Sequence, residues 1–507
     1  MRVNINRMIL NILTPLITAL LVTCTYKINY PLLNHDRLAN QYYQDDAQWY
    51  LDNIPFFECS DKQIEQVYYY RWKLYKAHIR NIGDNRYVIT EFINHVPWDR
   101  EPYCTINAAS MHHIYEGRWL KDSRYMDGYI DYLYHGGNDR RYSESISDAA
   151  YARYLVNADA NFIIKQLDSM KNVYDRWYDH FDTARNLYYI AAMPDATEYT
   201  VASIDASGGK DGFDDGEAFR PTINSYMYGN AMALANISKM KGDTVEAQLY
   251  LQRAAELKKN VEQYLWNDSL QHFADRFKVH NQYVQYWNFI RSRELAGLIP
   301  WYFSLPSDTS SYNDSWKHAI DTSQLLGKFG FRTNEPSYQY YFKQFVFFEG
   351  QRGSQWNGPS WPYQTSQVIT GLANFLNNYN QQEVSNSDYV KMLRLFALQH
   401  YLPNGKLDLV ENYDPNLGGP IVYYYWSNHY LHSSFNNLVI TGLCGIRPSS
   451  VDSLVINPLV DNSIQYFCLA DVFYHGHKLT VIYDVNGSKY HLGKGLTVFV
   501  DGKKRHS

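Results

Sequence analysis

The stretch SYMYGNAMALANISKMKGDTVEAQLYLQRAAELKKNVEQYL, residues 225–265, decides the fold. Its second half begins at Asp243, a residue suited to cap a helix, with Glu246 three positions on. Apolar residues then recur at spacings of three and four, namely Ala247, Leu251, Ala254, Leu257, Val261 and Leu265. This periodicity predicts a helix with one apolar face. A second helix is predicted over 225–239, and the Lys241-Gly242-Asp243 turn between them predicts a helical hairpin.

The same pattern extends in both directions along the chain. Further helices are predicted at 363–377 and 388–400, and long loops rich in aromatic residues separate the hairpins. No fixed repeat length is present, which disfavours an open α-solenoid. Long loops of this kind are usually functional. We therefore predict a mainly α protein in which residues 35–448 form an (α/α)6 barrel, a closed toroid of helical hairpins.

The residues after Pro448 have the sequence pattern of strands rather than helices. Four segments alternate or are rich in β-branched residues, namely SLVINPL, QYFCLADVFY, HKLTVIYDV and LTVFVDGK. Asn486-Gly487 and Asp501-Gly502 are turn signals between such segments. The sequence predicts a small antiparallel β module over residues 449–507, packed on the barrel.

The N-terminus has the features of an export signal. Arg2 and Arg7 precede an apolar run from Met8 to Val22, which is short for a membrane span and is followed by polar chain. Residues 1–24 are predicted to be a signal peptide or, because Cys24 follows Leu-Val-Thr, a lipoprotein signal; an uncleaved anchor is the alternative. We expect an exported protein that is periplasmic, extracellular, or attached to a membrane through a lipid on Cys24.

Composition limits the class of ligand. The net charge of the 507 residues is −5 and no long basic run is present, which argues against a nucleic-acid partner. Tyrosine is abundant, with 48 residues, and its ring and hydroxyl suit wet clefts that bind flat or hydroxylated ligands. The four cysteines beyond Cys24 show no metal spacing and no C-x-x-C pair. We therefore expect mostly buried thiols and, in an oxidising compartment, at most one disulfide bridge.

Three segments hold candidates for sugar chemistry, which needs one protonated and one ionised carboxyl. The window 193–231 holds seven acids, and spacing alone does not choose among Asp195, Glu198, Asp205, Asp211, Asp214, Asp215 and Glu217. A calcium loop is disfavoured because the D-x-[DN]-x-[DN]-G register is missing. The segment 409–443 places Glu411 before a Gly-rich turn and several aromatics. The segment 95–122 combines Trp98, Arg118 and Trp119 with the adjacent His112 and His113, a poor metal pair.

These segments resemble one family. EGRWL, FRPTINSYMYGNA, RELAGLIPWYFSLP, QWNGPSWPYQTSQ, ENYDP and HSSFNNLVITGLCGIRP occur in the order typical of mannosylglycerate-hydrolase-like glycoside hydrolases, which are related to glycoside hydrolase family 63 and to the family 37 trehalases. The resemblance covers residues 53–502. It implies an (α/α)6 barrel, a carbohydrate substrate, an inverting mechanism with two carboxyls, and chemistry that needs no metal and no other cofactor.

The resemblance also implies catalytic roles. Glu411 in VENYDPNLGG matches the general base of the family. For the general acid we favour Glu198 over Asp211, because Lys210 beside Asp211 would lower the pKa of a carboxyl that must stay protonated. Glu198 in turn requires an insertion before Arg220. Asp195 and Glu217 are weaker alternatives for this role.

The expected sugar contacts are eight residues that combine aromatic faces with hydrogen-bonding groups. They are Trp98, Arg118, Trp119, Arg220, Asn224, Trp356, Asn357 and Trp361. We expect an exo-acting, inverting glycosidase for an α-linked glucoside, mannoside or related oligosaccharide. An inactive glycan-binding protein on the same scaffold is the alternative, since Ala196-Thr197 replaces the usual Gly-Met of the acid motif; a polysaccharide lyase is a third. The sequence leaves the sugar, the linkage and the oligomeric state open.

Overall fold

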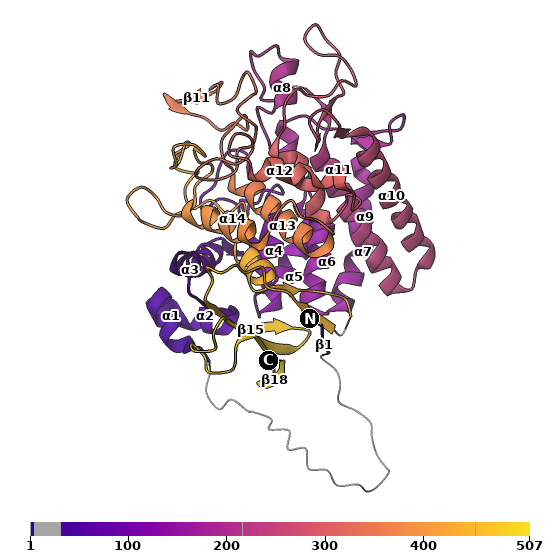
Figure 1. The fold of residues 1–507 in the computed structure, drawn as a ribbon. Coiled ribbons are helices and arrows are strands. Elements are labelled where there is room, and N and C mark those ends of the chain that lie inside the picture. The colour runs from indigo at the N-terminus through magenta and orange to yellow at the C-terminus, as the bar shows by residue number, and fades with distance from the viewer. Residues whose placement is uncertain (1, 5–31, 215, 452, 507) are drawn as a thin grey trace, which may run out of the picture.

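The computed structural model describes residues 2–4, 32–214, 216–451 and 453–506. Figure 1 shows a helical body with the C-terminal sheet at its lower end, and the contacts between elements arrange the helices in two rings. Contacts between six segments run round a closed inner circuit. In chain order these segments are α4 (Ser110–Gly117), α6 (Ile146–Asn157), α9 (Pro221–Lys241), η5 (Leu295–Phe303), α13 (Pro362–Asn378) and α15 (Asn436–Leu438) with its continuation η6 (Val439–Leu443). Since α15 contacts both α13 and α4, the circuit closes.

Six helices form the outer ring and alternate with the inner ones along the chain. They are α3 (Lys62–Ala77), α5 (Ser123–Tyr132), α7 (Ala160–Arg176), α10 (Thr244–Tyr264), α12 (Ser315–Ile320) and α14 (Asn386–Leu398). Each outer helix contacts at least one inner segment. This alternation confirms the predicted (α/α)6 barrel. Short helices α1 (His35–Tyr43), α2 (Ala47–Asn53), α8 (Val201–Ala206) and α11 (Ser310–Asn313) lie outside the two rings.

The hairpin that suggested the fold is present as α9 and α10. The Asp243 carboxylate accepts a 3.0 Å hydrogen bond from the backbone N–H of Glu246, and Gly242 ends α9 with φ of 85°. α9 begins four residues earlier than expected because Pro221 stands at its first position, where the missing N–H costs nothing. The predicted helices at 363–377 and 388–400 correspond to α13 and α14 within two residues.

The C-terminal residues form the predicted antiparallel sheet. Its strands are β15 (Tyr466–Tyr474), β16 (His477–Asp484), β17 (Gly495–Val500) and β18 (Lys503–His506). A fifth strand, β2 (Phe56–Cys59), comes from the start of the chain and pairs with β15. The sequence placed the sheet within residues 449–507, so β2 is a strand of this sheet that was not expected. It also ties the sheet to the helical body through backbone hydrogen bonds.

The remaining strands are short. β14 (Ser453–Ile456) lies between β1 (Arg2–Asn4) and β13 (Ile446–Arg447). Five two-stranded antiparallel sheets lie in the connections between helices. Four are hairpins: β3 (Ile79–Asn81) with β4 (Tyr87–Ile89), β5 (Phe181–Asp182) with β6 (Leu187–Tyr188), β8 (Trp266–Asn267) with β9 (His272–Phe273), and β11 (Phe347–Phe348) with β12 (Gln351–Arg352). The fifth pairs β7 (Ala218–Phe219) with β10 (Arg276–Phe277), which lie on either side of α9 and α10 in the chain.

The signal-peptide and lipid-anchor expectations concern residues 1–24, nearly all of which lie outside the described part of the chain. Within the described part, no helix is long and apolar enough to cross a bilayer. The four described cysteines are free thiols: Cys59, Cys444 and Cys468 are buried, and Cys104 is partly exposed. The bridge left open by the sequence is therefore absent among them.

Candidate active site

A cavity of about 900 Å³ opens where the outer-to-inner connections meet. Five connections supply its lining: residues 78–109 before α4, 133–145 before α6, 177–220 before α9, 321–361 before α13 and 399–435 before α15. Figure 1 places two markers of these connections, α8 and β11, at the end of the molecule opposite the C-terminal sheet. The N-terminal ends of inner helices thus face one cavity, which brings together residues far apart in sequence.

Aromatic side chains dominate the cavity wall. They include Trp98, Tyr142, Tyr199, Phe213, Phe348, Trp356, Trp361, Tyr363, Tyr423, Tyr424, Tyr425, Trp426 and Tyr430. Phe348, Tyr423 and Tyr425 are more than half exposed, so large flat faces remain open to a ligand. Such faces suit the C–H surfaces of sugar rings as well as other apolar groups.

Trp356 and Trp361 form the deep part of this wall. Their rings stack with centroids 4.2 Å apart and planes 9° from parallel. Both side chains are buried, and the Trp361 indole N–H donates a 3.0 Å hydrogen bond to the backbone oxygen of Gln355. The two rings therefore support each other and present only a small part of their surface to the cavity. Trp98 is more exposed, and its ring packs edge-on against Trp426 at 5.3 Å.

Glu411 and Glu198 both line the cavity. The Ser354 hydroxyl donates a 2.7 Å hydrogen bond to Oε1 of Glu411, while Oε2 has no hydrogen-bond partner among the described residues. Burial raises the pKa of Glu411 to about 7, with the Ser354 hydrogen bond acting against that rise and the charge of Glu198 adding to it. Burial also raises the pKa of Glu198 to about 7. Each carboxyl can therefore hold or release a proton near neutral pH.

The backbone around Glu198 fixes its position. Ala196 and Tyr199 on either side have φ of 55° and 64°, in the left-handed region that non-glycine residues adopt less often. The backbone oxygen of Glu198 accepts a 2.9 Å hydrogen bond from the N–H of Trp356. This bond joins the connection before α9 to the tryptophan-rich connection before α13. It therefore fixes the position of Glu198 relative to Trp356.

The sequence did not identify Glu91, a third carboxyl in the cavity wall. Glu91 is 7% exposed, and its Oε2 has no hydrogen-bond partner among the described residues. Burial raises its pKa to about 8; a hydrogen bond from Tyr430 acts against that rise, and the charges of Glu411 and Glu198 add to it. The only signal in the sequence is an acid inside the apolar run YVITEFI, which predicts burial but no role.

The other acids proposed for the general acid lie elsewhere. Asp195 is buried, and its two oxygens accept 2.6 Å hydrogen bonds from Ser143 and Thr222. It also pairs with Arg220 at 2.8 Å, so its role is to hold the fold. Asp211 is exposed, and Oδ1 accepts bonds from the N–H groups of Gly212 and Phe213. Neither Asp211 nor Glu217 is among the cavity-lining residues.

Five expected sugar contacts do not reach the cavity lining, because other residues occupy their polar groups. Asn437 accepts hydrogen bonds from both Arg118 (2.9 Å) and Trp119 (3.0 Å). Asn224 exchanges bonds with the backbone of Tyr188, and Asn357 donates to the carbonyls of Tyr340 and Lys343. All four are buried, Asn357 within the connection before α13. The structure therefore gives these residues packing partners, and the sugar-contact role expected of them stays a prediction.

Arg220, the fifth of them, is the centre of a buried ion network. Its guanidinium lies 2.8 Å from Asp195, 2.8 Å from Asp275 and 3.6 Å from Glu294. Its Nε donates to Asp275 and its Nη1 to Thr197, and Arg220 is not among the cavity-lining residues. Trp98, Trp356 and Trp361 are thus the expected contacts that do line it.

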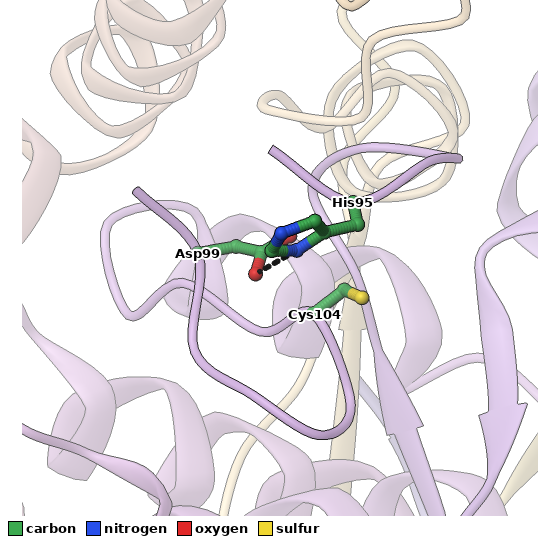
Figure 2. Close-up of side chains that lie close together, drawn as sticks. All are labelled: His95, Asp99 and Cys104. Carbon is green, nitrogen blue, oxygen red and sulfur yellow. Dashed lines mark hydrogen bonds and ion pairs between the residues drawn. The ribbon is translucent and has the colours of Figure 1, made fainter. Parts of the chain in front are cut away.

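One group of side chains within the described part of the chain has the composition of a metal site. His95, Asp99 and Cys104 place one ligand atom each within 4.8 Å of one another (Figure 2). The group lies on the connection before α4, beside Pro97 and Trp98 of the cavity wall. None of its three members is among the cavity-lining residues.

A closed double ring of helices with an aromatic, carboxyl-bearing cavity at the N-terminal ends of its inner helices is the architecture of (α/α)6-barrel glycoside hydrolases. The chain belongs to the family described as the mannosylglycerate hydrolase MGH1-like glycoside hydrolase domain, whose model matches residues 101–433, more than half of the chain. Residues 448–505 match the C-terminal domain of glycosyl hydrolase family 65.

Solved structures share this fold. A structure named "Sialidase" is 36% identical with a TM-score of 0.81, and the match covers 90% of this chain and 41% of that one. The chain therefore spans about two fifths of the length of that relative. The GH63 mannosylglycerate hydrolase from Thermus thermophilus in complex with Tris is 11% identical, with a TM-score of 0.50 and coverage of 73% of this chain and 98% of that one. The GH78 family rhamnosidase of a Bacillus species is 11% identical, with a TM-score of 0.54 and coverage of 85% and 40%.

Proposed function

We propose that this protein is an exo-acting, inverting glycoside hydrolase in which Glu411 is the general base and Glu198 the general acid. The observation that carries the proposal is the placement of two carboxyls, Glu411 buried and Glu198 partly buried, each with a pKa raised to about 7, on separate connections of one aromatic cavity. Two coupled groups with such values share one proton over part of the neutral range. Glycoside hydrolysis needs one protonated and one ionised carboxyl.

Hydrogen bonds act against the raised pKa of both carboxyls, so the order of roles rests on the motif around Glu411, which matches the general base of the family. Ser354 donates to Glu411 and stabilises its ionised form, which is the form that takes a proton from water. Glu198 then holds the shared proton and transfers it to the departing glycosidic oxygen as the bond to the anomeric carbon breaks. The water oxygen bonds to the opposite face of that carbon and its proton passes to Glu411. If the product is inverted, we expect the carboxyls about 6.5–9.5 Å apart.

The lining also favours an uncharged sugar. Four glutamates line the cavity, Glu91, Glu198, Glu349 and Glu411, whereas Arg141 is the one arginine or lysine among the lining residues. A carboxylate-bearing sugar would meet carboxyls with few compensating cations. We therefore place α-linked glucosides, mannosides and related oligosaccharides first. Sialosides, suggested by the name of the 36% identical structure, are the second group to test.

The test is hydrolysis of a panel of α- and β-linked aryl glycosides, disaccharides and sialosides, with product anomers followed by NMR. We expect inverted product from a neutral α-glycoside, lost by at least a thousandfold in both Glu411→Gln and Glu198→Gln. Asp211→Asn is the matched control and should keep its activity, since Asp211 lies outside the cavity lining. Retained product, or full activity in Glu198→Gln, would contradict the assigned mechanism.

A glycan-binding protein without activity would give a different result. No member of the panel would turn over, yet titration calorimetry with the same sugars would show binding. If the wild type turns over no sugar, and if it and the variants Glu411→Gln and Glu198→Gln bind the sugars equally well, the protein is a glycan-binding protein and the hydrolase proposal is wrong.

A further inference from the structure

Residues 95–104 fold back on themselves and bring three metal-binding side chains together, His95, Asp99 and Cys104, with the exposed Glu101 beside His95. Arg100 and Thr105 exchange two backbone hydrogen bonds, which return the chain so that Cys104 lies beside Asp99. The Nδ1 atom of His95 lies 2.9 Å from Oδ1 of Asp99 and 3.1 Å from Oε1 of Glu101. One imidazole nitrogen thus faces two carboxylates. Figure 2 shows Asp99 and the thiol-bearing Cys104 beside this imidazole.

We propose that His95, Asp99 and Cys104, with Glu101 as a fourth ligand, form a binding site for a Zn²⁺-class divalent cation at the rim of the cavity. Imidazole, thiolate and carboxylate are the side chains that bind zinc, and the thiolate disfavours the hard cations Ca²⁺ and Mg²⁺. On binding, the Cys104 thiol loses its proton to solvent as the Zn–S bond forms.

The geometry is close to what such an ion requires. The three ligand atoms lie within 4.8 Å of one another, and the His95–Asp99 side of this triangle measures 2.9 Å. A point central to a triangle of this size lies within about 2.8 Å of each atom, against ligand distances of about 2.0–2.3 Å for zinc. Small side-chain rotations bring the atoms to those distances. Asp99 is already fixed, since its Oδ2 accepts a 2.9 Å bond from the N–H of Val96.

Two features separate this cluster from an ordinary surface contact. Cys104 has φ of 58°, a conformation that a cysteine adopts at some cost in free energy and that here accompanies its approach to Asp99. The side chain of Asp99 is fully buried although its neighbours are polar, while His95 is 54% exposed and open to an ion arriving from solvent. In contrast, His135 and Asp131 form a similar pair at 3.4 Å with no thiol or second carboxylate recorded beside it.

A metal ion at this site would also affect the cavity wall. Pro97 and Trp98, which line the cavity, lie between the ligands His95 and Asp99. The backbone oxygen of Trp98 accepts a 2.8 Å bond from Arg141, another lining residue. A bound ion would close residues 95–104 into a rigid loop and restrict the motion of the Trp98 ring. The metal would act on substrate binding through Trp98 and would take no part in bond cleavage.

Cys104 offers a direct measurement, because the other three described cysteines are buried. In a Cys24→Ser background, which removes the N-terminal thiol, a thiol reagent applied to the folded protein should label one cysteine. Addition of Zn²⁺ should slow that labelling at least tenfold, and EDTA should restore it. Elemental analysis after equilibration with Zn²⁺ should give one ion per chain, and Co²⁺ should give a thiolate charge-transfer band in the near ultraviolet.

Variants make the assignment specific. Cys104→Ser should abolish the Co²⁺ band, and His95→Ala should weaken Zn²⁺ binding at least tenfold with an unchanged circular dichroism spectrum. His135→Ala is the matched control and should leave binding unchanged. The proposal is overturned if the folded protein takes up no Zn²⁺ at micromolar concentration, or if uptake is the same in Cys104→Ser and His95→Ala as in the wild type. Neither result bears on whether the protein hydrolyses glycosides.

Discussion

The Ser354 hydroxyl lies 2.7 Å from Oε1 of Glu411 and donates a hydrogen bond to it. This contact joins the connection before α13 to the connection before α15, and it stabilises the ionised carboxylate. Burial acts in the opposite direction and raises the pKa of Glu411 to about 7. Ser354 therefore helps to set the pH below which Glu411 is protonated and cannot accept a proton from water.

Ser354→Ala should shift the acidic limb of kcat/KM upward by about one pH unit, because a hydrogen bond to a charged group contributes about 1.5–3 kcal/mol and one pH unit corresponds to about 1.4 kcal/mol. The kcat/KM profile measures this shift, since it reports the free enzyme. Ser354→Thr keeps the hydroxyl and serves as the control. An acidic limb at the same pH in Ser354→Ala would mean that Glu411 is not the base.

Glu91→Gln should change how stability depends on pH. The pKa of Glu91 is raised by burial from 4.5 to about 8 in the folded protein. Its contribution to stability is therefore fully present below pH 4.5 and is lost as the pH rises through 8, where the buried carboxyl must ionise. Between about pH 5 and 9 the wild type should lose stability relative to Glu91→Gln, by about 5 kcal/mol as an upper limit.

Urea unfolding at several pH values measures this difference. Glu349→Gln is the control, since Glu349 also lines the cavity but is exposed. A pH dependence that is the same in Glu91→Gln and the wild type would show that Glu91 ionises in the folded protein as readily as in the unfolded chain.

The sequence predicted two helices of each ring, α9 and α13 inside and α10 and α14 outside, but the signal differs between the rings. α10 buries one face only, so Ala254, Leu257 and Val261 mark it by their spacing. α9 is buried on nearly every side and carries Asn, Ser and Gly among its buried residues, so a helical period is weak there. β2 was missed because four residues next to a helix give little alternation, and its partner β15 lies about 400 residues away.

Some residues of the candidate site could be predicted from the sequence and others could not. Glu411 and Glu198 lie in loops whose motifs could be matched, and both line the cavity. Arg118 and Trp119 were assigned to sugar binding because EGRWL resembles a family motif, yet they bind Asn437 inside the barrel. A single sequence does not separate a motif that binds ligand from one that packs two helices. Glu91 belongs to no motif, and only the folded chain places it beside the other two carboxyls.

Arg220→Met tests whether Arg220 is structural. The substitution leaves Asp195, Asp275 and Glu294 buried without their shared cation, which should cost about 3–5 kcal/mol of unfolding free energy. Chemical denaturation provides the measurement. Arg141→Met is the control, because Arg141 lines the cavity and is exposed, so its loss should affect substrate binding more than stability. A stable Arg220→Met protein with raised KM would restore the sugar-contact role.

Trp98→Ala and Trp361→Ala should separate ligand contact from packing within one cavity wall. Trp98 is partly exposed beside Trp426, so its removal should raise KM about tenfold or more with little change in stability. Trp361 is buried, stacks on Trp356 and donates to Gln355, so Trp361→Ala should lower the unfolding free energy by about 3–5 kcal/mol. Steady-state kinetics and urea unfolding on both variants give the comparison. The opposite result would be a lowered unfolding free energy in Trp98→Ala and a change in KM alone in Trp361→Ala. It would mean that Trp98 packs the wall and that Trp361 contacts the ligand.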